Sequence, residues 1–221
     1  MSYYYSNNGG MGRGGFLSSA PPVTKNLIII NIIIFLATYV GERVLKTNVM
    51  SWLVLYDPRS YMFRWWQPLT YAFMHGGFWH ILFNMYTLYI FGSVVERMIG
   101  SRKFGVLYTI CALGAAACHS SVMIALHGAA NPMLGASGAV YGVVIAYAML
   151  FPTSQITLLF PPVTLSAKWM VLIFLGIEML TGLSGTIEGV AHFAHLGGML
   201  LGWLLILYWK RNGKLFDRDN F

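Results

Sequence analysis

One serine and one histidine of this chain have the residue types and surroundings of a nucleophile and its general base. Ser137 lies within GASG (residues 135–138), which resembles the turn that presents a reactive serine. His195 lies within AHLGG (residues 194–198). A histidine within hydrogen-bonding distance activates a serine hydroxyl by removing its proton. The two residues therefore predict nucleophilic catalysis, provided that the elements carrying them meet.

The elements that must position these residues are membrane helices. The chain has 221 residues, of which 57% are hydrophobic and 10% charged, whereas soluble domains carry about 25% charged residues. Six apolar stretches reach or approach the length that crosses about 30 Å of hydrocarbon; they cover residues 25–41, 78–99, 104–126, 137–151, 167–184 and 190–209. The fourth would span only about 22 Å, so Ser137 is expected below one membrane surface. The sequence thus predicts an all-α membrane protein with six transmembrane helices.

The basic residues indicate the direction of these spans. Ten of them fall on the side of the two termini and four on the opposite side, and cytoplasmic segments are the ones enriched in Lys and Arg. Both termini are therefore expected in the cytoplasm, and the net charge of +7 reflects topology rather than a nucleic-acid site. We expect a disordered N-terminal tail (1–22), a six-span domain (23–209) and a C-terminal tail (210–221).

The longest connection between spans, residues 42–77, is rich in aromatic residues. Aromatic, amphipathic segments lie at the membrane interface, so this first loop is expected to anchor the protein there. Cys111 and Cys118 lie within one apolar stretch without other metal-ligating residues nearby. They are interpreted as small packing residues, and neither a metal nor a cofactor is expected.

Four polar residues of the spans are expected at one depth. Ser137 opens the fourth span, and His195 lies near the outer end of the sixth. His80 and Asn84 lie one turn apart near the outer start of the second span, so they share a face. Polar groups inside a membrane are costly and are usually functional. Their convergence on the outer leaflet predicts a site that water fills from outside.

Two pairs of glycines accompany the serine and the histidine. Gly138 and Gly142 lie on the fourth span, and Gly198 and Gly202 on the sixth. Glycines spaced by four residues allow two helix backbones to approach closely. The pattern is typical of helix packing, and a close crossing would also bring Ser137 and His195 within hydrogen-bonding distance.

The chain resembles the rhomboid family of intramembrane serine proteases over residues 24–209. The resemblance rests on GASG (135–138), on AHLGG (194–198) followed by Gly202, on the stretch from His75 through His80 to Asn84, and on Glu96-Arg97. One position departs from it. Gln67 follows Trp66 where the family often has arginine, which concerns the stability of the first loop rather than the chemistry.

The resemblance implies a Ser–His dyad without an acidic third member. Ser137 would be the nucleophile and His195 its general base. His80 and Asn84 would stabilise the oxyanion together with the backbone N–H of Ser137. Supporting roles would fall to Tyr141, whose ring would pack on the histidine, and to Gly135, Gly138, Gly198 and Gly202.

The sequence also indicates whether an acidic residue accompanies the Ser–His pair and which histidine is the general base. No Asp lies in any of the six stretches, and Glu178 in the fifth is expected to be protonated or hydrogen-bonded toward the bundle interior. His192 is an alternative base. The positions three and seven residues after it are His195 and Met199, which are too bulky for close helix packing, so His195 is preferred.

The expected function is endoproteolytic cleavage of transmembrane segments near the outer leaflet. Substrates would be membrane proteins whose spans carry helix-weakening Gly, Pro or polar residues, and a minimal six-span protein fits a bacterial cytoplasmic membrane. The alternative is a catalytically inactive rhomboid-like protein that binds or escorts membrane proteins. It would be expected to lack Ser137 or His195, and both are present. A transporter would place its polar groups near the membrane midplane rather than near one face.

Overall fold

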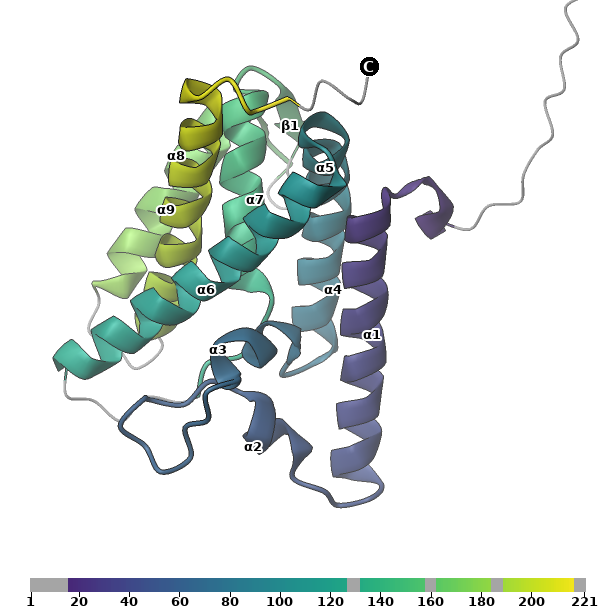
Figure 1. Ribbon diagram of the computed structural model, residues 1–221, viewed down its shortest axis with the longest axis vertical. Coiled ribbons are helices and arrows are strands. Elements are labelled where there is room, and N and C mark those ends of the chain that lie inside the picture. The colour runs from purple at the N-terminus through teal and green to yellow at the C-terminus, as the bar shows by residue number, and fades with distance from the viewer. Residues whose placement is uncertain (1–15, 127–131, 158–161, 184–188, 217–221) are drawn as a thin grey trace, which may run out of the picture.

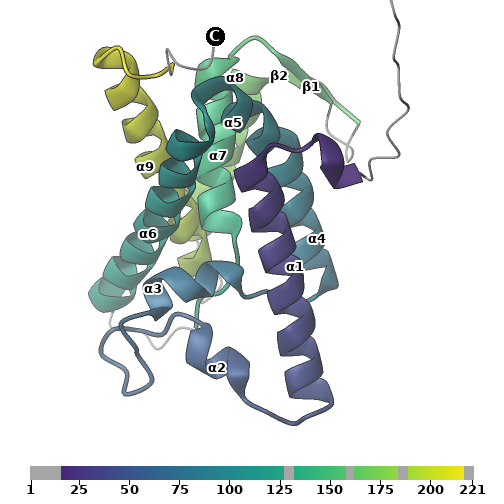
Figure 2. The same ribbon diagram turned by 45° about the vertical axis from the view of Figure 1, so that its right-hand side comes forward.

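The long helices of the chain stand side by side in a bundle (Figures 1 and 2). The computed structural model describes residues 16–126, 132–157, 162–183 and 189–216. Its long helices are α1 (Pro22–Arg43), α4 (Phe78–Thr87), α5 (Ser93–Ile99), α6 (Ser101–Leu126), α7 (Ser137–Leu150), α8 (Ala167–Gly182) and α9 (Gly189–Arg211). The π-helical turn η3 (Leu88–Gly92) joins α4 to α5, so one helical segment runs from Phe78 to Ile99.

Shorter elements fill the connections between these helices. They are the 3-10 helix η1 (Phe16–Ser19), the first-loop elements α2 (Val49–Leu53), α3 (Gln67–Thr70) and η2 (Tyr71–Phe73), and the strands β1 (Gln155–Thr157) and β2 (Thr164–Ser166). The strands pair antiparallel between α7 and α8. The structure is mainly helical, as expected of an all-α membrane protein. This short hairpin was not expected, because three-residue strands are too short to show a period of two in the sequence.

The boundaries of the tails also differ from expectation. Phe16–Ser19 is helical and α1 begins at Pro22, within the stretch expected to be a disordered tail (1–22). Proline suits the first turn of a helix because its missing N–H has no partner to lose there. At the other end, α9 continues to Arg211. Residues 1–15 of the N-terminal tail and 217–221 of the C-terminal tail lie outside the described residues.

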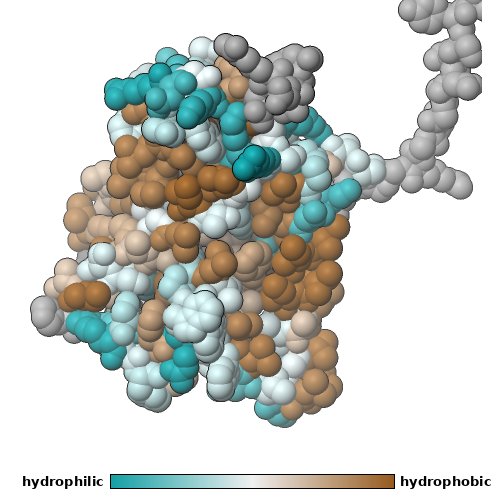
Figure 3. All heavy atoms as spheres, viewed as in Figure 1, coloured by the Kyte–Doolittle hydropathy of each residue, from teal (hydrophilic) through white to brown (hydrophobic). Residues whose placement is uncertain are grey.

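The chain is an integral, multi-pass membrane protein. Among the residues that the structure describes, four helical segments are long and apolar enough to cross a membrane, namely Pro22–Arg43, Phe78–Ile99, Ser101–Ala125 and His192–Arg211. Helices α7 and α8 are apolar but have only 14 and 16 residues. On the face shown in Figure 3, hydrophobic side chains dominate the middle, hydrophilic ones gather at the top, and the lower end is mixed. An extensive apolar surface of this kind suits lipid rather than water.

Helix α7 packs against α6, α8, α9 and η3 in the interior of the bundle (Figure 2). Small residues make this close packing feasible. A Cβ atom on Gly142 would lie 2.6 Å from Cβ of Cys111 on α6 and 2.8 Å from the carbonyl oxygen of Gly198 on α9. Cys111 is buried and not in a disulfide, so it packs between helices as expected.

The Glu96 carboxylate joins the end of α5 to the start of α1. It accepts hydrogen bonds from the backbone N–H groups of Val23 (2.9 Å) and Thr24 (2.7 Å) and from the Ser101 hydroxyl (2.7 Å). The first N–H groups of a helix lack partners within it and favour negative charge. Glu96 is 1% exposed, and these bonds compensate for its burial.

Gln67, at the position that departs from the family pattern, holds the first loop together. It is completely buried. Its Oε1 accepts the N–H of Arg64 (3.1 Å), and its Nε2 donates to the carbonyl of Met62 (3.0 Å). The neighbouring Trp66 indole donates to the carbonyl of Trp52 (3.0 Å). The glutamine amide thus supplies hydrogen bonds within the loop without a charged side chain.

Candidate active site

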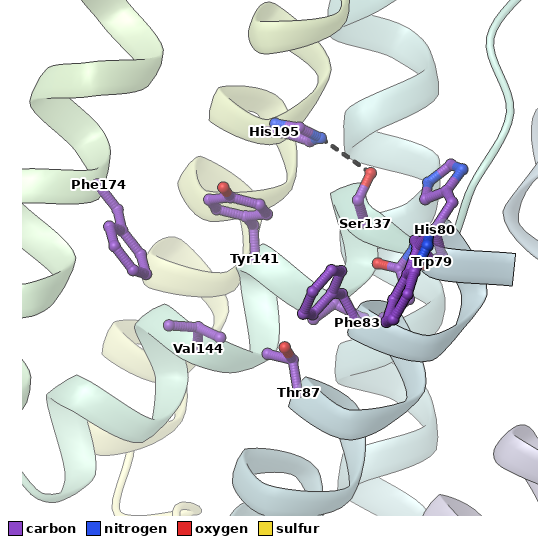
Figure 4. A pocket seen from close by; sticks show the side chains of 11 residues that line it. Trp79, His80, Phe83, Thr87, Ser137, Tyr141, Val144, Phe174 and His195 are labelled. Atoms are coloured by element: carbon purple, nitrogen blue, oxygen red, sulfur yellow. Dashed lines mark hydrogen bonds between the residues drawn. The ribbon is translucent and has the colours of Figure 1, made fainter. Parts of the chain in front are cut away.

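Ser137 is the first residue of α7, and its Oγ lies 2.8 Å from Nε2 of His195 on α9 (Figure 4). The turn before the serine is fixed by Gly135, whose φ of 120° falls in the region that favours glycine. The Gly135 N–H donates to the Tyr71 carbonyl (3.0 Å), and the Tyr71 hydroxyl donates to the Ala112 carbonyl of α6 (2.7 Å). The first loop and α6 therefore hold the serine turn in place.

The glycine pairs bring α7 and α9 together at this point. A Cβ atom on Gly198 would overlap the carbonyl oxygen of Gly138, and one on Gly202 would lie 2.6 Å from the carbonyl oxygen of Gly142. The obstacle is backbone in both cases, so it cannot rotate away. Only glycine at 198 and 202 permits this helix separation, on which the distance between Ser137 and His195 depends.

Tyr141 lies one turn after Ser137 and stacks on the His195 ring. The two ring centroids are 4.4 Å apart and the ring planes differ by 7°. Such a contact fixes the plane of the imidazole while leaving both of its nitrogens free for hydrogen bonds. The structure thus places Tyr141 where the resemblance led us to expect it.

His80 and Asn84 face the same cavity from α4. Asn84 is 7% exposed, and its Nδ2 donates to the backbone carbonyl of His80 (3.0 Å), which uses one of its two hydrogens. A Cβ atom on Gly135 would lie 2.7 Å from Nε2 of His80, so glycine at 135 also makes room for this imidazole. The structure brings all four predicted polar residues to one cavity.

The His75 ring packs edge-on against the His80 ring. Their ring centroids are 5.1 Å apart in an edge-on arrangement, and His75 is 1% exposed. Burial, with a smaller effect from His80, lowers the pKa of His75 to about 4. His75 is therefore neutral near pH 7 and places no positive charge beside His80.

An acidic side chain, Glu178, lies beside His195, whereas the resemblance implies a Ser–His pair without one. Glu178 lies on α8 and is 5% exposed. Its Oε2 lies 3.0 Å from Nδ1 of His195 and 2.5 Å from Nδ1 of His192. The expected hydrogen bonding toward the bundle interior is present, but its partners could not be foreseen. The only signal in the sequence was an ionisable residue inside an apolar stretch.

His192 is not the partner of Ser137. It lies on α9 three residues before His195, and the two rings meet edge-on with centroids 6.1 Å apart. Its Nδ1 is directed to Glu178. Within the described residues, Glu178, His192 and His195 form the one group of three side chains whose spacing could hold a metal ion. Both histidine Nδ1 atoms of this group lie at hydrogen-bonding distances from Oε2 of Glu178.

The cavity next to Ser137 has a volume of about 410 Å³. Its polar lining includes His80, Asn84, Ser137 and His195, together with Thr87 and Tyr141. The apolar lining comes from Trp79, Phe83, Val140, Val144 and Phe174. Figure 4 shows the serine and histidine on one side and the apolar side chains of α4, α7 and α8 around the rest. The site therefore combines a nucleophile–base pair with an apolar binding surface.

Known proteins share this sequence pattern. Residues 62–212 match the family model described as "Rhomboid domain", a range that holds all the residues of the site. The chain belongs to the rhomboid family. This confirms the resemblance that the motifs indicated.

Curated rhomboid proteins from plants, yeast and bacteria resemble the chain. It is 36% identical over 140 residues to "RHOMBOID-like protein 4" of Arabidopsis thaliana, covering 63% of this chain and 33% of that protein. It is 34% identical over 134 residues to "Rhomboid protein 1, mitochondrial" of Saccharomyces cerevisiae, covering 60% and 38%. It is 39% identical over 97 residues to "Rhomboid protease GlpG" of Klebsiella pneumoniae, covering 43% and 33%.

The chain matches only part of each of these relatives. The matched segments make up about a third of the length of each of these rhomboid relatives. Their sources include plant, mitochondrial and bacterial proteins, so they do not support the expectation of a bacterial cytoplasmic membrane in particular.

Proposed function

We propose that this rhomboid protein is an intramembrane serine endopeptidase. The observation that carries the proposal is the 2.8 Å contact between Oγ of Ser137 and Nε2 of His195 at an apolar cavity among membrane helices. In the first step, Nε2 accepts the hydroxyl proton while Oγ attacks a peptide carbonyl carbon. The resulting tetrahedral intermediate collapses to an acyl-serine when Nε2 returns the proton to the leaving amine. Water, activated by the same nitrogen, then releases the acid and regenerates the serine.

The oxyanion of the tetrahedral intermediate would be stabilised at the start of α7. The backbone N–H of Ser137 is in the first turn of that helix, where N–H groups lack intrahelical partners and the helix dipole favours negative charge. Asn84 retains one Nδ2 hydrogen beyond its bond to the His80 carbonyl, and the His80 ring lies beside Gly135. Donors that converge on a developing oxyanion typically contribute several kcal/mol.

The proposed substrates are transmembrane segments that unwind easily. In an intact helix each carbonyl is hydrogen-bonded to the N–H four residues later, so a serine can attack only where the helix has opened. Glycine, proline or polar residues lower the cost of opening. The apolar lining, which includes Trp79, Phe83 and Phe174, suits the side chains of such a segment.

We further propose a six-span bundle with both termini in the cytoplasm. The start of α1 and the end of α9 lie toward one end of the molecule, and the loop with α2 and α3 lies at the other (Figure 1). That loop carries exposed aromatic side chains, with Tyr61 87% and Trp65 82% exposed. The two short helices α7 and α8 would complete the six.

The topology predicts opposite locations for two reporters. A reporter fused after Phe221 is expected in the cytoplasm, because the basic residues cluster on that side. The same reporter inserted after Ser60, in the first loop, is expected outside. Alkaline phosphatase, which is active only outside, provides the measurement. Equal activity at both positions would overturn the six-span proposal.

The alternative, an inactive protein that binds or escorts membrane proteins, differs in the reactivity of the serine. A fluorophosphonate reacts with a serine that has an adjacent base, so the purified protein should be labelled at a single residue, Ser137. Peptide mass spectrometry identifies the modified residue. A folded protein that stays unlabelled at Ser137 would favour the binding function. Ser60 of the first loop, a half-buried serine whose hydroxyl accepts the Met62 N–H, serves as the internal control.

A further inference from the structure

Glu178 is the acidic side chain closest to the proposed catalytic pair in the described part of the chain. Its Oε2 lies 3.0 Å from Nδ1 of His195, while Nε2 of the same ring lies 2.8 Å from Oγ of Ser137. The three side chains thus form one hydrogen-bonded row that starts on α7, passes through α9 and ends on α8. The row has the arrangement in which a carboxylate orients a catalytic histidine.

We infer that Glu178 is a positioning residue that holds His195 as a base, giving this protein a Ser–His–Glu arrangement. The inference rests on the proposed protease function. A neutral imidazole can remove the Ser137 proton only when Nε2 is unprotonated and Nδ1 carries the hydrogen. The Glu178 carboxylate accepts that Nδ1 hydrogen and so favours the required tautomer. When Nε2 takes up the serine proton, the imidazolium that forms is next to a negative charge in surroundings of low dielectric constant.

Three helices together determine the orientation of the His195 ring. Tyr141 of α7 fixes its plane by stacking at 4.4 Å, and α9 supplies its backbone. Stacking alone leaves the ring free to turn within that plane, and it does not select a tautomer. The hydrogen bond to Glu178 of α8 supplies both of these restraints.

His192 holds the carboxylate rather than the serine. Its Nδ1 lies 2.5 Å from Oε2 of Glu178, and the Tyr141 hydroxyl also interacts with this carboxylate. A buried carboxylate is stable only when its oxygens are hydrogen-bonded. His192 and Tyr141 therefore stabilise the buried Glu178 carboxylate in the apolar interior, where it is hydrogen-bonded to His195.

Two other roles of Glu178 lead to different results. A purely structural carboxylate would tie α8 to α9, and its removal would lower stability without a selective effect on the chemical step. A metal ligand would hold an ion together with His192 and His195. Against the metal, both ring nitrogens approach the same carboxylate oxygen at hydrogen-bond distances, which leaves no room for an ion between them.

The test compares Glu178→Gln with Lys168→Gln, a charge removal at the other end of α8. Glutamine is close in size to glutamate but carries no charge. We expect Glu178→Gln to lower kcat for a single-span substrate by about 10- to 100-fold, by analogy with groups that orient a metal-bound histidine through its second nitrogen, with KM changed by less than about twofold. Glu178→Asp should recover part of kcat, because it restores the carboxylate at a greater distance. Lys168→Gln should match the wild type.

The variant His192→Ala tests whether His192 only holds the Glu178 carboxylate or acts on Ser137 itself. His195 keeps its bond to Glu178 in this variant, but the carboxylate loses one hydrogen-bond partner, so we expect a partial loss of kcat that is smaller than that of Glu178→Gln. Proton NMR of protein labelled with ¹⁵N-histidine gives a second readout. A strongly deshielded Nδ1–H signal of His195 should be present in the wild type and in His192→Ala, and absent from Glu178→Gln.

The outcomes distinguish this inference from the proposed function. If Ser137→Ala is inactive while Glu178→Gln retains the wild-type kcat and the deshielded signal, the protease function stands and the role of Glu178 is refuted. If Ser137→Ala cleaves as fast as the wild type, the proposed function itself fails. EDTA should leave the wild-type kcat unchanged. A loss that Zn²⁺ restores would assign the three side chains to a metal site and overturn the positioning role.

Discussion

Replacing Ser137 by alanine is expected to abolish cleavage of a transmembrane substrate while the protein still folds. The substitution removes one oxygen atom, which is hydrogen-bonded to His195. It leaves the start of α7 otherwise unchanged. Removing a catalytic serine from a serine protease lowers kcat by about six orders of magnitude, which is below detection in a gel-based assay. Turnover in proteoliposomes, with thermal unfolding as the measure of folding, checks the prediction.

Replacing His195 by alanine should cause the same loss for a different reason. Ser137 keeps its hydroxyl but loses the base that removes its proton, and Tyr141 loses the ring on which it stacks. The loss should therefore come with a lower unfolding temperature, unlike that of Ser137→Ala. Purified, folded samples of either variant that retain more than a tenth of wild-type turnover would refute the assignment.

Substitution of Gly198 by valine is expected to cripple catalysis although residue 198 takes no part in the chemistry. Its first added atom would overlap the Gly138 carbonyl oxygen, so α9 must move away from α7. A displacement of about 1 Å at a catalytic pair can cost 100-fold in rate. We expect the folded fraction to react with a fluorophosphonate at least about 100 times more slowly than the wild type. The fold should also be destabilised, because overpacking typically costs about 1–3 kcal/mol.

The matched control for this variant is Gly176→Val on α8. No atom lies within 4 Å of a Cβ built on Gly176, so the same change of residue type meets open space. It should label at the wild-type rate. Normal labelling of folded Gly198→Val would show that the glycine serves only general packing, and the link between helix separation and catalysis would be wrong.

The sequence predicts the parts of this fold that follow from local pattern. Apolar length places the helices within a few residues, and the spacing of Gly198 and Gly202 indicates their close contact with α7. The stacking of Tyr141 on His195 follows from the family resemblance, since one turn of helix separates Tyr141 from Ser137.

Other features depend on tertiary structure, such as which faces of two packed helices meet, and no local sequence pattern predicts them. Glu178 and His195 lie on consecutive helices, α8 and α9. Their separation in the sequence does not show which face of α8 contacts α9. The hairpin of β1 and β2 is too short for a periodic signal. From the sequence, Gln67 is only a departure from a family pattern, because its four hydrogen bonds within the first loop depend on the folded path of that loop.

Mass spectrometry of the products formed in a lipid bilayer tests the central claim most directly. Purified protein and a single-span substrate with a glycine in the outer half of its apolar segment would be placed in the same vesicles. Two fragments are expected, whose masses add up to the substrate plus one water molecule, from a cut inside the apolar segment near the glycine. They should be absent with Ser137→Ala. A cut confined to the segments outside the membrane, or the same fragments from Ser137→Ala, would contradict intramembrane proteolysis by this site.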